Sequence, residues 1–224
     1  LSLPLLVIQG LAFAGGLVAV ALVYAVATLV RGRDPVLVLV LAGIVIGTLL
    51  GAGVSMIKVL ADPYNQLPAI TFWLLGSLAA VNRDDLLTIA PLFILAAAPL
   101  VALHWRMNVM TLGEEEARSL GVDTTKVRIA VIVCATLMTA AVVSVSGIVG
   151  WVGLVIPHIA RFLVGPSFGR LLPVAMLMGG AFMLVVDTLA RALGPMEIPL
   201  GVLTSIVGAP IFIWVLATAR RDWQ

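Results

Sequence analysis

The chain has little charge, one cysteine and two histidines, and these shortages exclude several classes of protein. Of its 224 residues, 11% are charged and 62% are hydrophobic, whereas a water-soluble domain carries about 25% charged residues. The mean hydropathy of +1.20 is typical of a protein surrounded by lipid. The single cysteine, Cys134, lies within an apolar run, so the chain contains neither a disulfide framework nor a thiolate metal site. The net charge of +2 gives no indication of nucleic-acid binding.

Motifs for catalysis and for cofactor binding are also missing. The sequence has no GxxxxGK[ST] phosphate-binding loop, so we expect no ATP and no other cofactor to be bound by this chain. His104 and His158 have no second ligand at a metal-binding spacing. Ser144 and Ser146 are not part of a GxSxG nucleophile motif. We therefore predict no catalytic residue and no metal site.

Long uncharged runs predict an all-α, polytopic bundle of membrane-spanning helices. A helix needs about 20 apolar residues to cross the hydrocarbon core of a bilayer. Five runs are candidates for such helices: Leu3–Val30, Pro35–Ile57, Leu86–Leu103, Leu171–Val186 and Ile198–Ala219.

The distribution of basic residues decides two ambiguous runs. Tyr64–Asn82 is interrupted by Pro68 and Gly76, and a crossing there would divide the arginines between the two sides of the membrane. We therefore predict a helix lying at the outer interface. Ile129–Pro157 is too short for two full crossings, so we predict one full helix and a short return piece. Ten of the 13 basic residues then lie on the inner side, as the positive-inside rule requires.

These assignments predict about seven crossings, with the chain entering from outside and ending inside. We predict that the return is made at a bend built on Gly147, Gly150, Gly153 and Pro157. Glycine allows a sharp turn, and irregular backbone is tolerated at membrane depth where protein surrounds it.

One charged segment, Thr111–Arg128, interrupts the apolar sequence. It holds seven of the chain's 24 charged residues. The spacing of Thr111 and Glu114 predicts a capping box, and Glu114 and Arg118 are placed for an i,i+4 ion pair. Gly121 is expected to end the short helix, and Asp123 or Thr124 to begin the next one. The charged segment is either a solvated loop or a rigid element that meets a cytoplasmic protein, and these features leave the two alternatives even.

A second polar pair lies near the outer end of a predicted span. Asp187 and Arg191 are separated by four residues on one helix, so they can pair with each other. Arg191 can instead offer its planar set of donors to a carboxylate on an external partner. Physical reasoning alone favours the internal pair.

Five segments carry a family resemblance: LGEEEARSLGV (Leu112–Val122), GIVGWVGLVIPHIARFLVG (Gly147–Gly165), LLPVAMLMGGAFMLVVDTLAR (Leu171–Arg191), EIPLGVLTSIVGAPIFIWVL (Glu197–Leu216) and FWLLGSL (Phe72–Leu78). They resemble the FecCD family of permeases, which serve ABC importers of iron-siderophores, haem and cobalamin. The similarity covers almost all 224 residues and keeps the motifs in order. Ile148 and Trp151 depart from the family pattern, which often has proline and phenylalanine there.

The resemblance implies an architecture and a set of partners. Family members have ten membrane helices, so residues 1–224 would be one permease domain that lacks about three N-terminal helices. The expected partners are a second permease subunit in a homodimer, two cytoplasmic ATPase subunits that bind ATP with Mg²⁺, and an external substrate-binding protein. The expected location is the cytoplasmic (inner) membrane of a prokaryote.

The resemblance also assigns roles to residues. It makes residues 111–128 the coupling segment and makes Arg191 a docking residue for the binding protein, which places docking above the internal pair. The residues expected to contact the ATPase are Gly113, Glu114, Glu115, Glu116, Ala117, Arg118, Ser119, Leu120, Gly121 and Val122.

We therefore expect a permease subunit of an ABC importer for a metal chelate such as an iron-siderophore, haem or cobalamin. The alternative is a secondary transporter or channel, but such proteins usually place ionisable residues within their spans, and these spans are almost free of charge. A second alternative, an intramembrane enzyme, would need a convergent set of catalytic residues, and the sequence shows none. Nothing in these residues selects one chelate, or distinguishes a chelate from an oxyanion.

Overall fold

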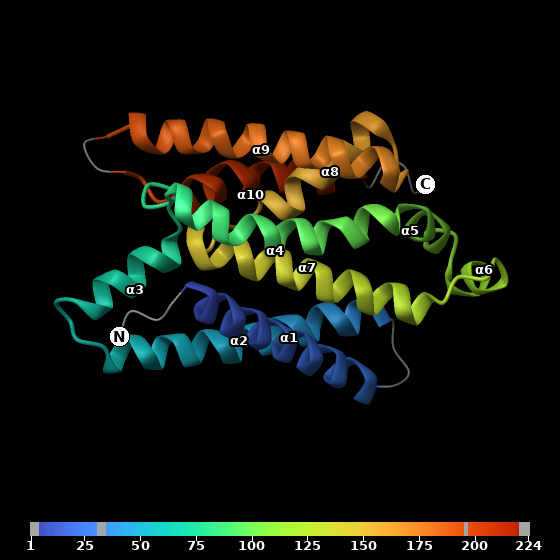
Figure 1. Ribbon diagram of the computed structural model, residues 1–224, viewed down its shortest axis with the longest axis horizontal. Helices are drawn as coiled ribbons and strands as arrows, with labels where there is room; N and C mark the ends of the chain where they lie inside the picture. Colours follow the sequence, from blue (N-terminus) through green and yellow to red (C-terminus); the bar gives the residue numbers. More distant parts are fainter. Residues whose placement is uncertain (1–4, 31–34, 195–196, 220–224) are drawn as a thin grey trace. The chain divides into compact units, whose positions relative to one another are not determined.

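The fold is all-helical in the part of the chain that the computed structural model describes, namely residues 5–30, 35–194 and 197–219. The described residues form ten helices, α1 to α10, and no strand (Figure 1). The chain divides into two compact units, Leu1–Phe72 and Trp73–Gln224. Each unit is described by itself.

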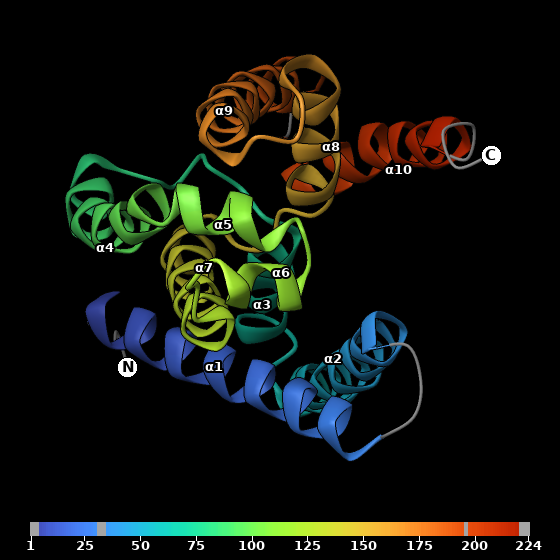
Figure 2. The same ribbon diagram turned by 90° about the vertical axis from the view of Figure 1, so that its right-hand side faces the viewer.

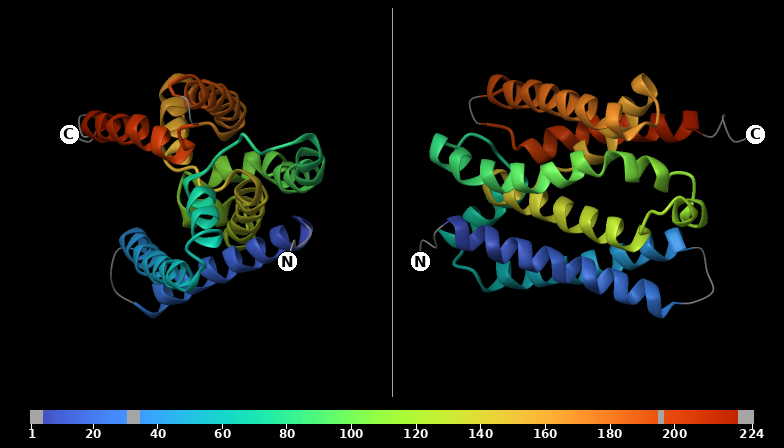
Figure 3. Two further views of the ribbon diagram at one scale, coloured as in Figure 1. Left: turned by 90° about the vertical axis from the view of Figure 1, so that its left-hand side faces the viewer. Right: turned by 45° about the vertical axis from the view of Figure 1, so that its right-hand side comes forward.

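The first unit is built on two long helices that pack against each other. α1 (Leu5–Leu29) and α2 (Pro35–Leu60) are antiparallel (Figures 1 and 3). Val38, Ala42 and Ile46 are buried and recur every four residues, so they form one buried stripe on α2.

α3 (Gln66–Leu75) follows the hairpin and crosses the division between the units. Its ten residues make it about 15 Å long, which is too short to cross a bilayer. The predicted helix over Tyr64–Asn82 is thus present but ends earlier. It stops because Gly76 has a φ of +75°, outside the helical region.

Two helix pairs form the body of the second unit. α4 packs against α7 and α8 packs against α9, while α10 contacts α8 and α9 (Figure 2). Two short helices, α5 and α6, connect α4 to α7. The bounds are α4 Arg83–Ala102, α5 His104–Met110, α6 Glu114–Ser119, α7 Thr124–Ser146, α8 Val152–Val164, α9 Phe168–Ala192 and α10 Leu200–Ala219.

α4 begins three residues before the predicted span at Leu86. Asn82 and Asp85 form a capping box, in which the Asn82 side chain accepts from the Asp85 N–H and Asp85 accepts from the Asn82 N–H. This first turn lies outside the predicted span because its residues are charged. They satisfy the free N–H groups at the helix start instead of breaking the helix.

Five of the described helices are long and apolar enough to cross a membrane: α1, α2, α4, α7 and α9. The chain is therefore a multi-pass membrane protein. α8 and α10 correspond to the other two predicted crossings. With 13 residues, α8 is about 20 Å long, which agrees with the short return piece expected after α7.

The second unit has two distinct ends. α6 lies at one end, and the end of α9 and the start of α10 lie at the other (Figures 1 and 3). Since α7 has 23 residues, its termini are about 35 Å apart. The two groups of candidate residues are therefore separated by roughly the thickness of a bilayer.

Candidate functional site

The short helix α6 is closed at its C-terminus by a Schellman motif. The Val122 N–H donates to the Ala117 carbonyl at 3.0 Å, and the Gly121 N–H donates to the Arg118 carbonyl at 2.9 Å. Gly121 has a φ of +79°, the left-handed conformation that this motif requires. The prediction that Gly121 ends the helix is confirmed.

A small hydrophobic cluster holds α6 in place. Val109 from α5, Ala117 from α6, Val127 from α7 and Val122 from the α6–α7 connection are all buried together. Ala117 is completely buried, so α6 packs closely against its neighbours at that position. The α5–α6 connection and the start of α7 thus form one packed body.

Ion pairs add further cross-links within this body. Glu114 pairs with Arg118 at 3.7 Å, as the i,i+4 spacing predicts, and also with Arg128 of α7. The Arg118 Nε donates to the hydroxyl of buried Thr124 at 3.2 Å. The contacts to Arg128 and Thr124 join α6 to α7. They were not predicted, because local spacing within one helix gives no information about them.

The predicted capping box between Thr111 and Glu114 is wrong. α5 extends to Met110, so Thr111 lies at the C-terminus of α5, and its hydroxyl donates to the Asn108 carbonyl at 2.7 Å. Gly113 is the N-cap of α6 and makes no side-chain capping bond. Its φ of +121° suits glycine alone, and the Glu116 carboxylate occupies the space that a Cβ atom would need.

Asp123 caps the start of α7, which confirms one of the two predicted alternatives. Its carboxylate accepts from the Lys126 N–H at 3.1 Å and pairs with the Lys126 ammonium at 3.0 Å. The backbone N–H of Lys126, followed by its side chain, lowers the pKa of Asp123 below the usual 3.8. Asp123 is therefore fully charged at neutral pH.

The charged segment also exposes two large apolar side chains. Leu112 and Leu120, which flank α6, are 61% and 55% exposed. Glu115 and Ser119, on α6 itself, are exposed as well. A solvated loop gains nothing from exposed leucines at a polar end of the molecule, whereas apolar residues within a polar rim are typical of a protein-binding surface.

At the other end of α7, the chain turns through a short connection, residues 147–151. Gly147 (φ +69°) and Gly150 lie in this connection, whereas Gly153 and Pro157 lie inside α8. The predicted bend is thus narrower than its four proposed residues. Trp151 also has a positive φ of 68°. Its ring packs against Phe212 with the ring centroids 6.0 Å apart.

Three glycines bring three backbone segments into direct contact, and we call Gly76, Gly147 and Gly201 the glycine junction. A Cβ atom at Gly147 would overlap the Trp73 carbonyl oxygen. A Cβ at Gly76 would lie 2.7 Å from the Ile148 oxygen, and one at Gly201 would lie 2.7 Å from the Leu75 oxygen.

Backbone hydrogen bonds hold the glycine junction together. The Ser77 N–H donates to the Ser146 carbonyl at 2.9 Å, and the Leu200 N–H donates to the Gly76 carbonyl at 2.9 Å. The end of α3, the α7–α8 connection and the start of α10 are therefore joined through main-chain atoms. The contacts at Gly76 and Gly201 were not predicted from the sequence.

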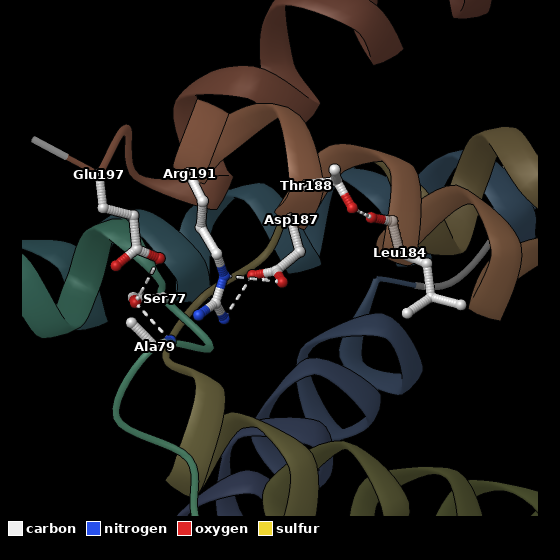
Figure 4. Close-up of polar contacts among 7 residues, drawn as sticks. All are labelled: Ser77, Ala79, Leu184, Asp187, Thr188, Arg191 and Glu197. Carbon is white, nitrogen blue, oxygen red and sulfur yellow. Dashed lines mark hydrogen bonds and ion pairs between the residues drawn. The ribbon is translucent and has the colours of Figure 1, made fainter. Parts of the chain in front are cut away.

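Arg191 lies at the end of α9, near Ser77, the residue that follows Gly76 of the glycine junction (Figure 4). It donates to both carboxylate oxygens of Asp187 at 3.0 Å. The internal pair expected from the sequence is therefore present, while the docking role remains a prediction. The Arg191 side chain is 49% exposed. Nearby, the Ser77 hydroxyl donates to Glu197 at 3.0 Å, which links the segment after α3 to the segment before α10.

A cavity within the second unit has a different character from these two ends. It has a volume of about 540 Å³ and lies among residues of α4, α7, α8 and α9, including Phe93, Met138, Ile156 and Met176. Its lining offers few polar groups. A charged substrate would find few partners there, so the cavity does not extend the candidate site.

Comparison with known proteins gives one family. The model of the FecCD transport family matches residues 1–218. A solved structure of an ABC transporter described as metal-chelate type, in an inward-facing conformation, superposes with a TM-score of 0.80 at 37% identity. That match covers 95% of this chain and 74% of the solved one.

Curated relatives carry different substrates in their names. The chain is 43% identical over 176 residues to the molybdate import permease MolB of Haemophilus influenzae, covering 79% of this chain and 52% of the relative. It is 40% identical to the cobalamin import permease BtuC of Halobacterium salinarum, and that match covers 96% of this chain and 58% of the relative. It is 37% identical to the hemin transport permease HmuU of Yersinia pestis, and that match covers 94% of this chain and 63% of the relative. The chain thus spans about half to two thirds of the length of these relatives.

Proposed function

Because the chain belongs to the FecCD transport family, we propose that it forms the membrane-spanning part of a permease that imports a metal chelate, driven by ATP hydrolysis in partner subunits. The observation that carries this proposal is the rigid α6 helix and the exposed leucines beside it. It lies about 35 Å along α7 from the end that holds Arg191. The chain thus offers one surface to each side of a membrane.

α6 is proposed to receive the ATPase subunit. Its packed cluster and the ion pairs of Glu114 connect it firmly to α5 and α7, so a push on its surface moves these helices as well. The proposed contact residues are Gly113 to Val122. Leu112 and Leu120 extend the surface with apolar area that the partner would bury.

Arg191 is proposed to dock the external binding protein through an acidic side chain. Its two bonds to Asp187 hold the guanidinium in a fixed orientation while half of the side chain stays exposed. A carboxylate on the partner can therefore approach without first ordering the arginine.

The proposed assembly is a homodimer of permease subunits with two ATPase subunits and one binding protein, in the cytoplasmic (inner) membrane of a prokaryote. ATP and Mg²⁺ would be bound by the ATPase subunits. Closure of those subunits would press on α6 and change the access of a central path between the two permease subunits. The bend at Gly147 and Gly150 would act at the opposite end of α7.

We propose a metal chelate as the substrate because several relatives are named for one. They include permeases for cobalamin, hemin and iron chelatin, and the similar solved structure is of the metal-chelate type. A relative named for molybdate import makes an oxyanion the competing outcome. Uptake of labelled cobalamin, haem, a ferric siderophore and molybdate into vesicles with the complete transporter separates these substrates.

The two surfaces can be tested against each other in the complete transporter. The pair Leu112→Ser and Leu120→Ser removes exposed apolar area at the α6 end without touching the buried cluster. We expect its affinity for the ATPase subunit to fall by about tenfold or more, with unchanged affinity for the binding protein. Arg191→Gln should give the reverse pattern. Affinities measured by pull-down with each purified partner provide the readout.

Leu193→Ser is a matched control for the leucine pair. Leu193 is 60% exposed, like Leu112 and Leu120, but it follows α9 at the opposite end. It should leave binding of the ATPase subunit unchanged. If Leu193→Ser lowered the affinity for the ATPase subunit as much as the double variant does, the exposed leucines would act through general solubility. Unchanged ATPase affinity in the double variant would contradict the assignment of α6.

A further inference from the structure

The body that contains α6 is in contact with the start of α9, the helix that carries Arg191 at its far end. α5 packs against α9, and α5 shares the buried cluster of α6 through Val109. At the contact, the His104 ring lies against Gly169, where an added Cβ atom would be 3.5 Å from the ring. α6 is thus connected to the first turn of α9 through packed residues of α5.

One hydrogen bond marks this contact. The Phe168 N–H donates to the Asn108 Oδ1 at 2.6 Å. Phe168 is the first residue of α9, and its N–H is one of the groups that no helical carbonyl can satisfy. Ser167, the N-cap residue, makes no side-chain capping bond. Asn108 of α5 thus provides a side-chain cap for α9 from another helix.

α9 then runs as one helix to the opposite end of the unit, with Pro173 inside it near the start. Its 25 residues give a length of about 37 Å. Near its end, Val186 and Ala190 are buried with Leu200 of α10, and the Ala190 carbonyl accepts from the Ile198 N–H at 3.0 Å. Asp187 and Arg191 are located in this last part of the helix. The first turn of α9 and the part that holds the arginine therefore belong to one helix.

We propose that Asn108 is a positioning residue that links the ATPase-facing end of the chain to the docking end, by holding the start of α9 to α5. The inference rests on the proposed function, since it names the route by which the two partners sense each other. Occupation of Arg191 by the binding protein would change the position of α9, and the Asn108–Phe168 bond would pass that change to α5 and α6.

Substitutions can remove each half of the bond separately. Asn108→Leu removes the acceptor at similar size. Phe168→Pro removes the donor, and proline is favoured at the first position of a helix. Ser167 has φ −63° and ψ 116°, an extended conformation outside the helical region that a following proline disfavours. Two matched variants keep the bond: Asn108→Asp retains an acceptor oxygen, and Phe168→Leu retains the N–H.

The first measurement is ATP hydrolysis by the complete transporter, with and without the binding protein. We expect Asn108→Leu and Phe168→Pro to leave basal hydrolysis unchanged and to reduce its stimulation by about threefold to tenfold, the range for loss of one hydrogen bond. The double variant should lose no more than either single variant. Asn108→Asp and Phe168→Leu should retain most of the stimulation.

Each outcome separates the link from the proposed function. Normal stimulation in both Asn108→Leu and Phe168→Pro would overturn the link alone, as would an equal loss in Phe168→Leu, which would assign the effect to the ring. Absence of stimulation in the wild-type transporter would overturn the proposed function and the link with it. Melting temperatures of the same variants in detergent test the bond without any partner. Additive losses in Asn108→Leu and Phe168→Pro would show that the two groups are not coupled.

Discussion

The two ends of the second unit are held together by opposite means. At the α6 end, side-chain contacts join the segments: Ala117 and Val122 pack in a buried cluster, and Glu114 pairs with two arginines. At the other end, the absence of side chains lets backbones touch, and main-chain groups of Ser77 and Leu200 form the bonds.

This difference predicts how each end responds to change. A side-chain network can lose one member and keep the others, because its contacts are distributed over several residues. A junction of three backbones has no such reserve, since an added methyl group at one glycine separates the segments it joins. We therefore expect a substitution at the α6 end to cost less stability than a substitution in the glycine junction.

The largest effect is expected from Gly147→Ala in the glycine junction. The new Cβ atom would overlap the Trp73 carbonyl oxygen, and the φ of +69° is unfavourable for alanine. Overpacking and backbone strain each cost about 1 to 3 kcal/mol, so the total loss is roughly 2 to 6 kcal/mol. Thermal or denaturant unfolding of the purified protein in detergent measures it.

Gly150→Ala is the matched control, three residues along the same connection. A Cβ atom there meets nothing within 4 Å, and the φ of Gly150 lies outside the left-handed region. Its stability should stay close to that of the wild type. If Gly147→Ala were equally harmless, the three segments would not be in the close contact described, and the contrast between the two ends would disappear.

The α6 end could be predicted in large part from the sequence because its signals are local. Glu114 and Arg118 lie close together in the sequence, and Gly121 follows them within a few residues. The predicted ion pair and the predicted end of the helix at Gly121 are both confirmed. The error at Thr111 is local as well. The prediction overlooked α5, which extends to Met110 and uses the Thr111 hydroxyl at its own C-terminus.

The glycine junction could not be predicted in the same way. Gly76, Gly147 and Gly201 are separated by more than 50 residues each, and hydrophobic periodicity does not indicate which distant backbones meet. The sequence singled out Gly147 as a bend, but not its contact with Trp73. The cap that Asn108 provides for Phe168 was missed for the same reason, since 60 residues separate the two.

A smaller effect is expected from Gly121→Ala at the α6 end. Like Gly147, Gly121 has a positive φ, +79°, but a Cβ atom there meets nothing within 4 Å. The variant thus isolates the backbone term, about 1 to 2 kcal/mol, from the steric overlap. Unfolding measured beside Gly147→Ala gives the difference between the two. A loss at Gly121 as large as at Gly147 would mean that conformation, not close approach, dominates both ends.

The smallest effect concerns pH and the cap of α7. Because its pKa in the folded protein lies below the usual 3.8, the charge on Asp123 favours folding at neutral pH. This contribution is complete above the unfolded pKa and disappears as the pH falls through the folded value. Asp123→Asn keeps an acceptor for the Lys126 N–H but removes the charge. We expect the difference in melting temperature between wild type and this variant to shrink between about pH 5 and pH 3.

Lys126→Met tells which group causes this pH dependence. It removes the ammonium that pairs with Asp123 but keeps the backbone N–H, which is the larger cause of the lowered pKa. Part of the pH dependence should therefore remain in Lys126→Met, whereas it should be absent from Asp123→Asn. If Lys126→Met removed it entirely, the ion pair would be the main contact of Asp123, and the α6 end would depend on surface charge more than on capping of α7.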